Sequence, residues 1–178
     1  MILLARHGES RDNVAPQRFS GWLDAPLTDR GREQARALAA EAPDVAAIYS
    51  SQLSRALETA RIVGAPLGLE PVVDERLAES RRGSWEGRAL EEIQSSEPDA
   101  WAAWRRGGAD FRFPGGESLR EHQDRVLAAL EDVRMGPLPA LVVAHGGSIR
   151  AAVCASDPRG LDRFFEIPVP NAALVELP

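Results

Sequence analysis

Met1-Ile2-Leu3-Leu4-Ala5-Arg6-His7-Gly8 begins the chain, and its apolar run is followed at once by arginine, histidine and glycine. A second stretch has the same layout, Ala140-Leu141-Val142-Val143-Ala144-His145-Gly146-Gly147. Short apolar runs that end in glycine are typical of buried strands in a parallel sheet. Ligands and catalytic groups in such sheets gather beyond the carboxyl ends of the strands. If the two strands are neighbours, His7 and His145 face each other across one pocket.

The size and composition of the chain indicate an ordinary globular protein. Its 178 residues fit one domain, predicted over 1–178, and 44% of them are hydrophobic. The net charge of −6 argues against general binding to nucleic acid or to an anionic membrane. No apolar run approaches the length of a membrane span, and the N-terminus lacks a basic leader segment. We therefore expect a cytoplasmic protein.

The basic and sulfur-containing residues exclude several chemistries. All 21 basic residues are arginine, so a Walker phosphate loop and Schiff-base catalysis, which both need lysine, are excluded. The single cysteine, Cys154, cannot form an internal disulfide or a thiolate metal cluster. Three scattered histidines do not form a metal cage. We expect neither a metal nor another cofactor.

The apolar periodicity alternates between strand and helix, which predicts an α/β fold with a mostly parallel sheet and helices on both faces. Strands are expected over residues 1–6, 45–49, 71–74, 140–144 and 172–177. Helices are expected over residues 28–41, 53–63, 89–95, 98–105, 117–133 and 148–155. Residues 77–116 are a long excursion from this alternation, and we expect them to cover the active site.

The residues around the two histidines favour phosphate chemistry. A neutral imidazole at His7 can act as a nucleophile near neutral pH without a metal. Arginine forks suit phosphate oxygens, and both Arg6 and Arg55, the latter at the start of a predicted helix, are expected at the pocket. His145 would be protonated and would donate a hydrogen bond to a phosphate oxygen. Gly8 and the glycines after His145 allow the backbone to approach closely.

Two alternative chemistries are weaker, and the third histidine has no assigned chemistry. The beginning of a zinc deaminase signature at His7 lacks the paired cysteines that the signature requires. The segment after His145 is similar to an esterase oxyanion loop, but the chain has no Gly-x-Ser-x-Gly elbow. The third histidine, His122, lies on an apolar helical stripe, and we interpret it as a packing residue.

Taken together, the motifs resemble the histidine phosphatase superfamily, the group of the cofactor-dependent phosphoglycerate mutases. The matching segments follow in order along nearly the whole chain: Arg6-His7-Gly8-Glu9-Ser10-x-x-Asn13, Ser20-Gly21-Trp22-x-Asp24, Ser50-Ser51-x-Leu53-x-Arg55-Ala56, Gly83-x-Trp85-Glu86-Gly87, Pro114-Gly115-Gly116-Glu117-Ser118 and His145-Gly146-Gly147-x-x-Arg150. The resemblance implies a three-layer α/β/α sandwich.

The resemblance also assigns roles to individual residues. It implies that His7 is the phosphorylated nucleophile and that Glu79 is the general acid and base, whereas the nearby Glu86 is interpreted as a structural partner. The implied phosphate- and substrate-binding residues are Arg6, Gly8, Asn13, Ser20, Gly21, Arg55, His145 and Gly146. An arginine pair, Arg105 and Arg106, is similar to the pair that binds a carboxylate in the mutases, but it also fits a solvated helix end.

Several functions remain open at this point. The main prediction is a metal-independent phosphatase for a small phosphorylated metabolite, and the alternatives are a phosphoglycerate mutase and an α-ribazole phosphate phosphatase. The compact length, the end of the chain just after the last predicted strand and the lack of lysine favour a phosphatase over a mutase. A non-catalytic relative that only binds phosphorylated ligands is the alternative of another class. A homodimer is compatible with the sequence.

Overall fold

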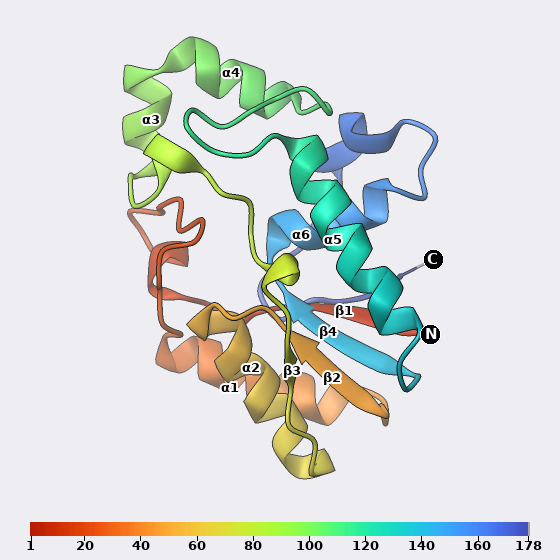
Figure 1. Ribbon diagram of the computed structural model, residues 1–178. Helices are drawn as coiled ribbons and strands as arrows, with labels where there is room; N and C mark the ends of the chain where they lie inside the picture. The colour runs from red at the N-terminus through yellow and green to blue at the C-terminus, as the bar shows by residue number, and fades with distance from the viewer. Residues whose placement is uncertain (178) are drawn as a thin grey trace.

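The computed structural model describes residues 1–177 and contains a five-stranded sheet between two layers of helices (Figure 1). The strands are β1 (Ile2–Arg6), β2 (Ala47–Ser50), β3 (Val72–Val73), β4 (Ala140–Ala144) and β5 (Leu174–Glu176). Their order across the sheet is β3-β2-β4-β1-β5, and only the edge strand β5 runs antiparallel to its neighbour. The predicted α/β fold with a mostly parallel sheet is confirmed.

Strands β1 and β4 are direct neighbours, as the two matching apolar runs suggested. They pair in parallel, with Arg6 opposite Ala144 at their carboxyl ends. The next residue on each strand is a histidine, and the imidazole rings of His7 and His145 lie 5.2 Å apart between centroids. The register of this one strand pair therefore assembles the centre of the pocket.

Alternation along β1 explains the layers. Successive side chains of a strand point to opposite faces. Ile2 and Leu4 contribute to one apolar core, and Leu3 and Ala5 contribute to a second core on the other face. Helices α1 (Asp29–Glu41) and α2 (Ser54–Gly64) cover the second core, whereas α5 (Leu119–Arg134) and α6 (Gly146–Cys154) cover the first (Figure 1).

Within the long excursion, α3 (Leu90–Ser96) and α4 (Pro98–Arg106) lie beyond the end of the sheet (Figure 1). An aromatic cluster packs them against the rest of the molecule. Trp85 is fully buried and lies 6.2 Å from Trp104 of α4 and 5.7 Å from Phe113 between ring centroids. Phe19 joins the same cluster, 5.0 Å from Trp104, from the first loop, which connects β1 to α1 over residues 7–28. This aromatic cluster is continuous with the first apolar core and anchors the excursion to it.

Most predicted elements agree with the structure to within one or two residues, and two differences concern the site. Helix α6 begins at Gly146 and not at Ser148, so its first turn lies at the pocket. The 3-10 turns Gly160–Glu166 and Gly83–Trp85 were not predicted, because such short turns lack an amphipathic repeat. No helix within residues 1–177 is long and apolar enough to cross a membrane.

Candidate active site

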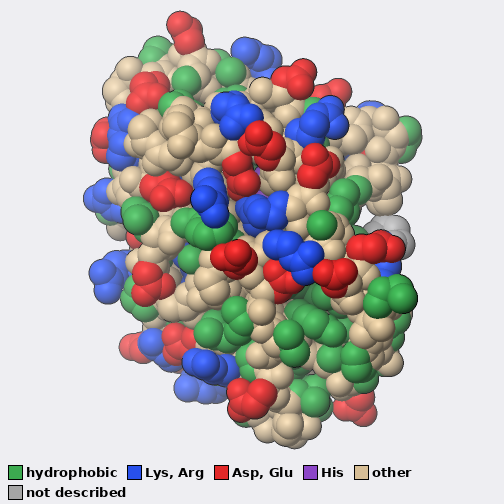
Figure 2. Space-filling model, in the orientation of Figure 1, with side chains coloured by type: hydrophobic (Ala, Val, Ile, Leu, Met, Phe, Trp, Pro, Cys, Tyr) green, Lys and Arg blue, Asp and Glu red, His purple; other side chains and the backbone are tan. Residues whose placement is uncertain are grey.

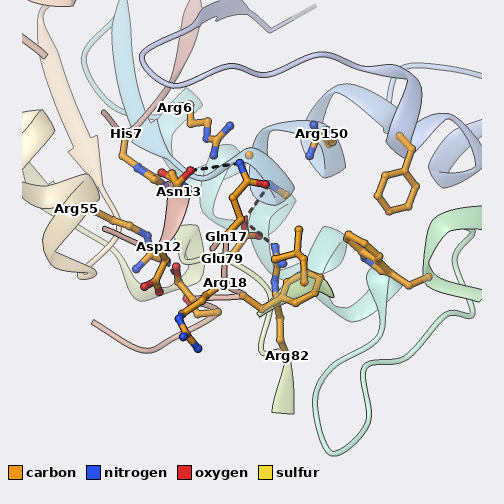
Figure 3. Close-up of a pocket in the computed structure, with 18 of the residues that line it drawn as sticks. Arg6, His7, Asp12, Asn13, Gln17, Arg18, Arg55, Glu79, Arg82 and Arg150 are labelled. Atoms are coloured by element: carbon orange, nitrogen blue, oxygen red, sulfur yellow. Dashed lines mark hydrogen bonds and ion pairs between the residues drawn. The ribbon is translucent and has the colours of Figure 1, made fainter. Parts of the chain in front are cut away.

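A cavity of about 350 Å³ lies beyond the carboxyl ends of β1 and β4 (Figure 3). It is lined by residues from the first loop, from the excursion and from the start of α6. Its charged side chains are six arginines and two acids: Arg6, Arg18, Arg55, Arg82, Arg105, Arg150, Asp12 and Glu79. The excess of guanidinium groups makes this an anion site, although the protein as a whole has a net charge of −6.

His7 is presented to the cavity as a neutral ring with a defined tautomer. Its Nδ1 donates to the carbonyl oxygen of Gly8 at 2.7 Å, and a carbonyl can only accept, so the proton resides on Nδ1. Within residues 1–177 the ring makes this one hydrogen bond, through Nδ1, and it lines the cavity. Burial and the charges of Arg55 and Arg6 lower the pKa of His7 to about 3. Nε2 therefore has a free lone pair at neutral pH.

His145 lies behind His7 and is completely buried. Its Nε2 is 2.7 Å from the hydroxyl oxygen of Ser51, at the end of β2, and its Nδ1 has no partner among the described residues. Burial, Arg55 and His7 hold the pKa of His145 well below its usual range. A buried imidazolium beside cations is unfavourable, so the ring is neutral in the unliganded protein, and its protonation with phosphate bound stays a prediction. A phosphate dianion against the ring would raise its pKa.

Arg6 and Arg55 are held by backbone carbonyls and not by carboxylates. Arg55, on the first turn of α2, is buried and donates to the carbonyls of Gly21 at 2.8 Å and Leu23 at 3.1 Å. Arg6 donates to the carbonyl of Val169 at 2.6 Å. Because neither side chain has an anionic partner in direct contact within residues 1–177, their charges remain available to an anion in the cavity.

The first loop supplies polar groups to the cavity. The side-chain oxygen of Asn13 accepts hydrogen bonds from the backbone and hydroxyl of Ser10 and from the amide of Asn171. This leaves the Asn13 amide nitrogen to donate, and the side chain lies beside His7 (Figure 3). Ser20 and Gly21 also line the cavity. Gly21 has a φ of +50°, and a side chain there would collide with Glu86.

Glu79 and Glu86, the two candidate acids, have different surroundings. Glu79 lines the cavity and accepts from the backbone N–H groups of Ser80 at 2.9 Å and Gly147 at 3.1 Å. Glu86 is not among the cavity residues, and its carboxylate accepts from the backbone N–H groups of Trp22 and Arg82. Glu86 thus ties the first loop to the excursion, whereas Glu79 faces the space that a substrate would fill.

The four other predicted binding residues have clear positions. Gly146 lines the cavity at the first turn of α6, whereas Gly8 packs against Gly31 and donates its N–H to the hydroxyl of Thr59 at 3.1 Å. Arg105 lines the cavity, with its guanidinium 4.8 Å from the ring centre of Phe165. Arg106 is exposed and does not line the cavity. The structure therefore separates the members of the arginine pair.

Sequence reasoning missed several groups that the fold brings to the site. Ser51, Thr59 and Arg150 were visible only as motif positions, and Asn171 and Arg82 gave no signal. Asn171 donates to the carbonyl of His7 at 3.2 Å from a segment distant in sequence. His122, interpreted as a packing residue, is indeed fully buried, but its Nε2 also lies 3.0 Å from the hydroxyl oxygen of Ser148 and 4.0 Å from Glu79.

The fold and the site together define a class of protein: an α/β sandwich that presents a neutral histidine within an arginine-lined anion pocket. The family model of the histidine phosphatase superfamily, branch 1, matches residues 2–178. The chain belongs to this superfamily. The resemblance inferred from the motifs, the fold class and the class of enzyme, a histidine phosphatase, are confirmed.

Similar proteins include enzymes named as phosphatases. A putative phosphoserine phosphatase 2 of Hydrogenobacter thermophilus is 37% identical over 179 residues, which is 99% of this chain and 88% of the relative. The structure of Bacillus stearothermophilus YhfR matches with a TM-score of 0.88 and 34% identity, over 98% of this chain and 90% of that one. A mycobacterial glucosyl-3-phosphoglycerate phosphatase in complex with VO3 matches with a TM-score of 0.83 and 33% identity, over 97% of this chain and 88% of that one.

Proposed function

We propose that the protein hydrolyses phosphomonoesters of small metabolites through a phosphohistidine formed on Nε2 of His7, without a metal. The observation that carries this proposal is the state of His7: a neutral ring whose free nitrogen faces a cavity lined by arginines. Membership of the histidine phosphatase superfamily and the names of the relatives support the same reaction.

In the first half-reaction, Nε2 of His7 attacks phosphorus, and the bond between phosphorus and the ester oxygen breaks. Arg6 and Arg55 bind the nonbridging oxygens, and the N-terminus of α6 adds its positive end. Glu79 donates a proton to the departing oxygen. General acid catalysis of this kind contributes about 10²–10⁴-fold to a rate.

In the second half-reaction, Glu79 accepts a proton from water as the water oxygen bonds to phosphorus and the bond to His7 breaks. The products are inorganic phosphate and the free enzyme. Although burial by itself raises the pKa of Glu79, Arg82, His122 and His145 hold it well below its usual range, so Glu79 is a carboxylate in the unliganded cavity. A bound phosphomonoester adds negative charge beside this carboxylate, which raises its pKa and favours the acid form required first.

The cavity favours substrates with a second anionic group. After Arg6 and Arg55 have bound the phosphate, the outer arginines Arg18, Arg105 and Arg150 are left around the rest of the substrate. Phosphoserine and glucosyl-3-phosphoglycerate, the substrates in the names of two relatives, both carry a carboxylate in addition to their phosphate. We therefore expect such phosphorylated acids to be better substrates than α-ribazole phosphate.

The test is phosphate release in the presence of a chelator, from a panel of phosphoserine, 3-phosphoglycerate, α-ribazole phosphate, sugar phosphates and nitrophenyl phosphate. Wild type should turn over at least one acidic substrate, and His7→Ala should reduce release at least about 10³-fold because the covalent route is lost. Acid-labile phosphate should be trapped on wild type only. Activity that survives in His7→Ala would contradict the mechanism, and turnover that requires added bisphosphoglycerate would indicate a mutase.

A second variant, Glu79→Gln, tests the acid role separately. We expect a fall of about 10²-fold or more in phosphohistidine formation from esters with poor leaving groups, and a much smaller fall with nitrophenyl phosphate, whose leaving group needs no proton. Rapid-quench measurement of phosphoenzyme formation with both substrates gives the comparison. Equal losses would assign the acid to another residue.

A further inference from the structure

Arg82 is a cavity residue that neither binds the phosphate nor transfers a proton in the reaction described above. Its guanidinium lies 3.3 Å from the Oε2 atom of Glu79, and its Nε donates to the hydroxyl of Ser80 at 3.2 Å. Figure 3 shows the two side chains meeting inside the cavity, with the ion pair drawn as a dashed line. Arg82 is the one arginine with this direct contact to Glu79 among the residues that the structure describes.

The position of the Arg82 side chain is restricted by aromatic rings that pack against its guanidinium group. Its guanidinium carbon lies 4.5 Å from the ring centre of Phe19 and 5.5 Å from that of Phe113, in the aromatic cluster of the excursion. The side chain is only 16% exposed. A guanidinium stacked on aromatic rings and shielded from water has little freedom, and its attraction to a nearby carboxylate is weakly screened. Arg82 therefore restricts where the Glu79 carboxylate can lie.

The other groups around Glu79 are hydrogen-bond donors or bases, and no second carboxylate contacts it within residues 1–177. The nearest facing groups are the backbone N–H of Ser80, the backbone N–H of Gly147 on α6 and His122 on α5. His145 and the cavity arginines Arg6, Arg55 and Arg150 act on Glu79 from further away. Among all the groups around Glu79 that the structure describes, Arg82 alone carries a permanent charge at contact distance. Removing that charge would weaken the preference of Glu79 for its ionised form.

We propose that Arg82 is a positioning residue for Glu79, holding its carboxylate over the cavity so that it can take the proton from water in phosphohistidine hydrolysis. This inference depends on the proposed two-step reaction. It assigns Arg82 to the second half-reaction, in which Glu79 must be a base. The first half-reaction with a good leaving group needs no proton and is expected to be nearly independent of Arg82.

The experiment measures the two half-reactions in Arg82→Met by rapid quench with nitrophenyl phosphate. Phosphohistidine formation should change by less than about threefold. Its decay, followed after a chase with unlabelled substrate, should slow by about ten- to a hundredfold, because part of the contribution of a well-placed base is lost. Phosphoenzyme should accumulate during turnover. The acidic limb of the decay rate against pH should move to higher pH, since loss of Arg82 raises the pKa of Glu79.

Two variants serve as comparisons. Arg81→Met makes the same change at the adjacent residue, whose guanidinium stacks on Trp22 at 4.0 Å and has no ion pair with Glu79, so decay should remain as in wild type. Arg82→Lys restores a positive charge at the site and should recover most of the decay rate, including in the case that Arg82→Met does not fold. Thermal unfolding of each variant reports on folding.

The outcomes separate this inference from the proposed function. If wild type forms no phosphohistidine, the proposed function fails. If wild type forms it but Arg82→Met slows formation and decay equally, or Arg82→Lys is as impaired as Arg82→Met while remaining folded, the role assigned to Arg82 is wrong. Accumulated phosphohistidine in Arg82→Met alone, with recovery in Arg82→Lys, supports it.

Discussion

Gly147 is a residue at which any side chain would directly disturb the proposed acid and base. A Cβ atom at this position would collide with the Oε1 atom of Glu79, and the backbone N–H of the same residue donates to the Oε2 atom at 3.1 Å. The glycine thus brings the first turn of α6 into direct contact with the proposed acid and base. A side chain there would force the Glu79 carboxylate away from the cavity.

We predict that Gly147→Ala lowers kcat at least about tenfold, because a displaced Glu79 carboxylate loses part of its contribution to general acid and base catalysis. The comparison variant is Gly146→Ala, where a Cβ atom meets its first neighbour, Nε of Arg6, at 3.5 Å, an ordinary contact. Its loss of kcat should be clearly smaller. Steady-state kinetics on both proteins give the answer, and equal losses would show that the collision with Glu79 is not the cause.

At the scale of single elements, helix α4 allows two adjacent arginines to be compared. Arg105 and Arg106 are adjacent on its last turn, but only Arg105 lines the cavity. The ring of Trp104, which points into the aromatic cluster, fixes the rotation of the helix and so decides which arginine faces inward. Helical periodicity predicts that one of two neighbours can face a site, but it cannot say which without the packing of the helix.

Arg105→Ala should raise KM for phosphoserine and 3-phosphoglycerate by about five- to thirtyfold, roughly the effect of removing one charge-assisted contact. It should change KM for nitrophenyl phosphate little, since that substrate has no second anionic group. Arg106→Ala is the matched control and should leave both values as in wild type. Unchanged KM values for Arg105→Ala with the acidic substrates would exclude the residue from substrate recognition.

At the scale of the whole molecule, charges of both signs are interspersed on the surface, whereas the three histidines are buried in the interior (Figure 2). Burial is the largest cause that lowers their pKa values, to about 3 for His7 and about 4 for His122, and well below the usual range for His145. Folding therefore keeps all three rings neutral at pH values where the unfolded chain binds protons.

The sign of the resulting pH dependence follows from linkage. These histidines bind protons more strongly in the unfolded chain, so their contribution to stability is fully present above about pH 6.5 and is lost as the pH falls toward the folded pKa values. The free energy of unfolding from urea titrations should thus decrease steadily between pH 7 and pH 4. A stability that stays constant over this range would contradict the burial of neutral rings.

His122→Gln isolates one ring, because glutamine can still donate to the hydroxyl of Ser148 but does not titrate. The loss of stability between pH 8 and pH 4 should be smaller in the variant by roughly 3 kcal/mol, the value for a pKa that falls from 6.5 to about 4 on folding. Urea titrations of both proteins at the two pH values measure the difference. An identical pH dependence in both would show that His122 is not neutral in the folded protein.

The sequence by itself determined the fold class, the two strands that end in His7 and His145, and the superfamily, whereas the sheet order showed that these two strands are neighbours. It could do so because buried parallel strands have a strong local signature and because the motifs hold to their order along the chain. The predicted bounds of the elements agree closely with the structure where the sequence has a clear apolar pattern, as in the continuous apolar run of residues 140–144. The identity of the nucleophile follows from the motif around His7, and its role remains a prediction until phosphohistidine is trapped.

Only the tertiary structure decided which groups meet in the cavity and in what state of charge. Arg82, which lines the cavity, and Asn171 and Ser51, which contact His7 and His145 behind it, lie far from His7 in sequence. No local pattern marks a side chain whose partner is distant in sequence. The charge of His145 likewise depends on the structure: the free energy of a buried charge is set by its surroundings in three dimensions, which a sequence pattern does not contain.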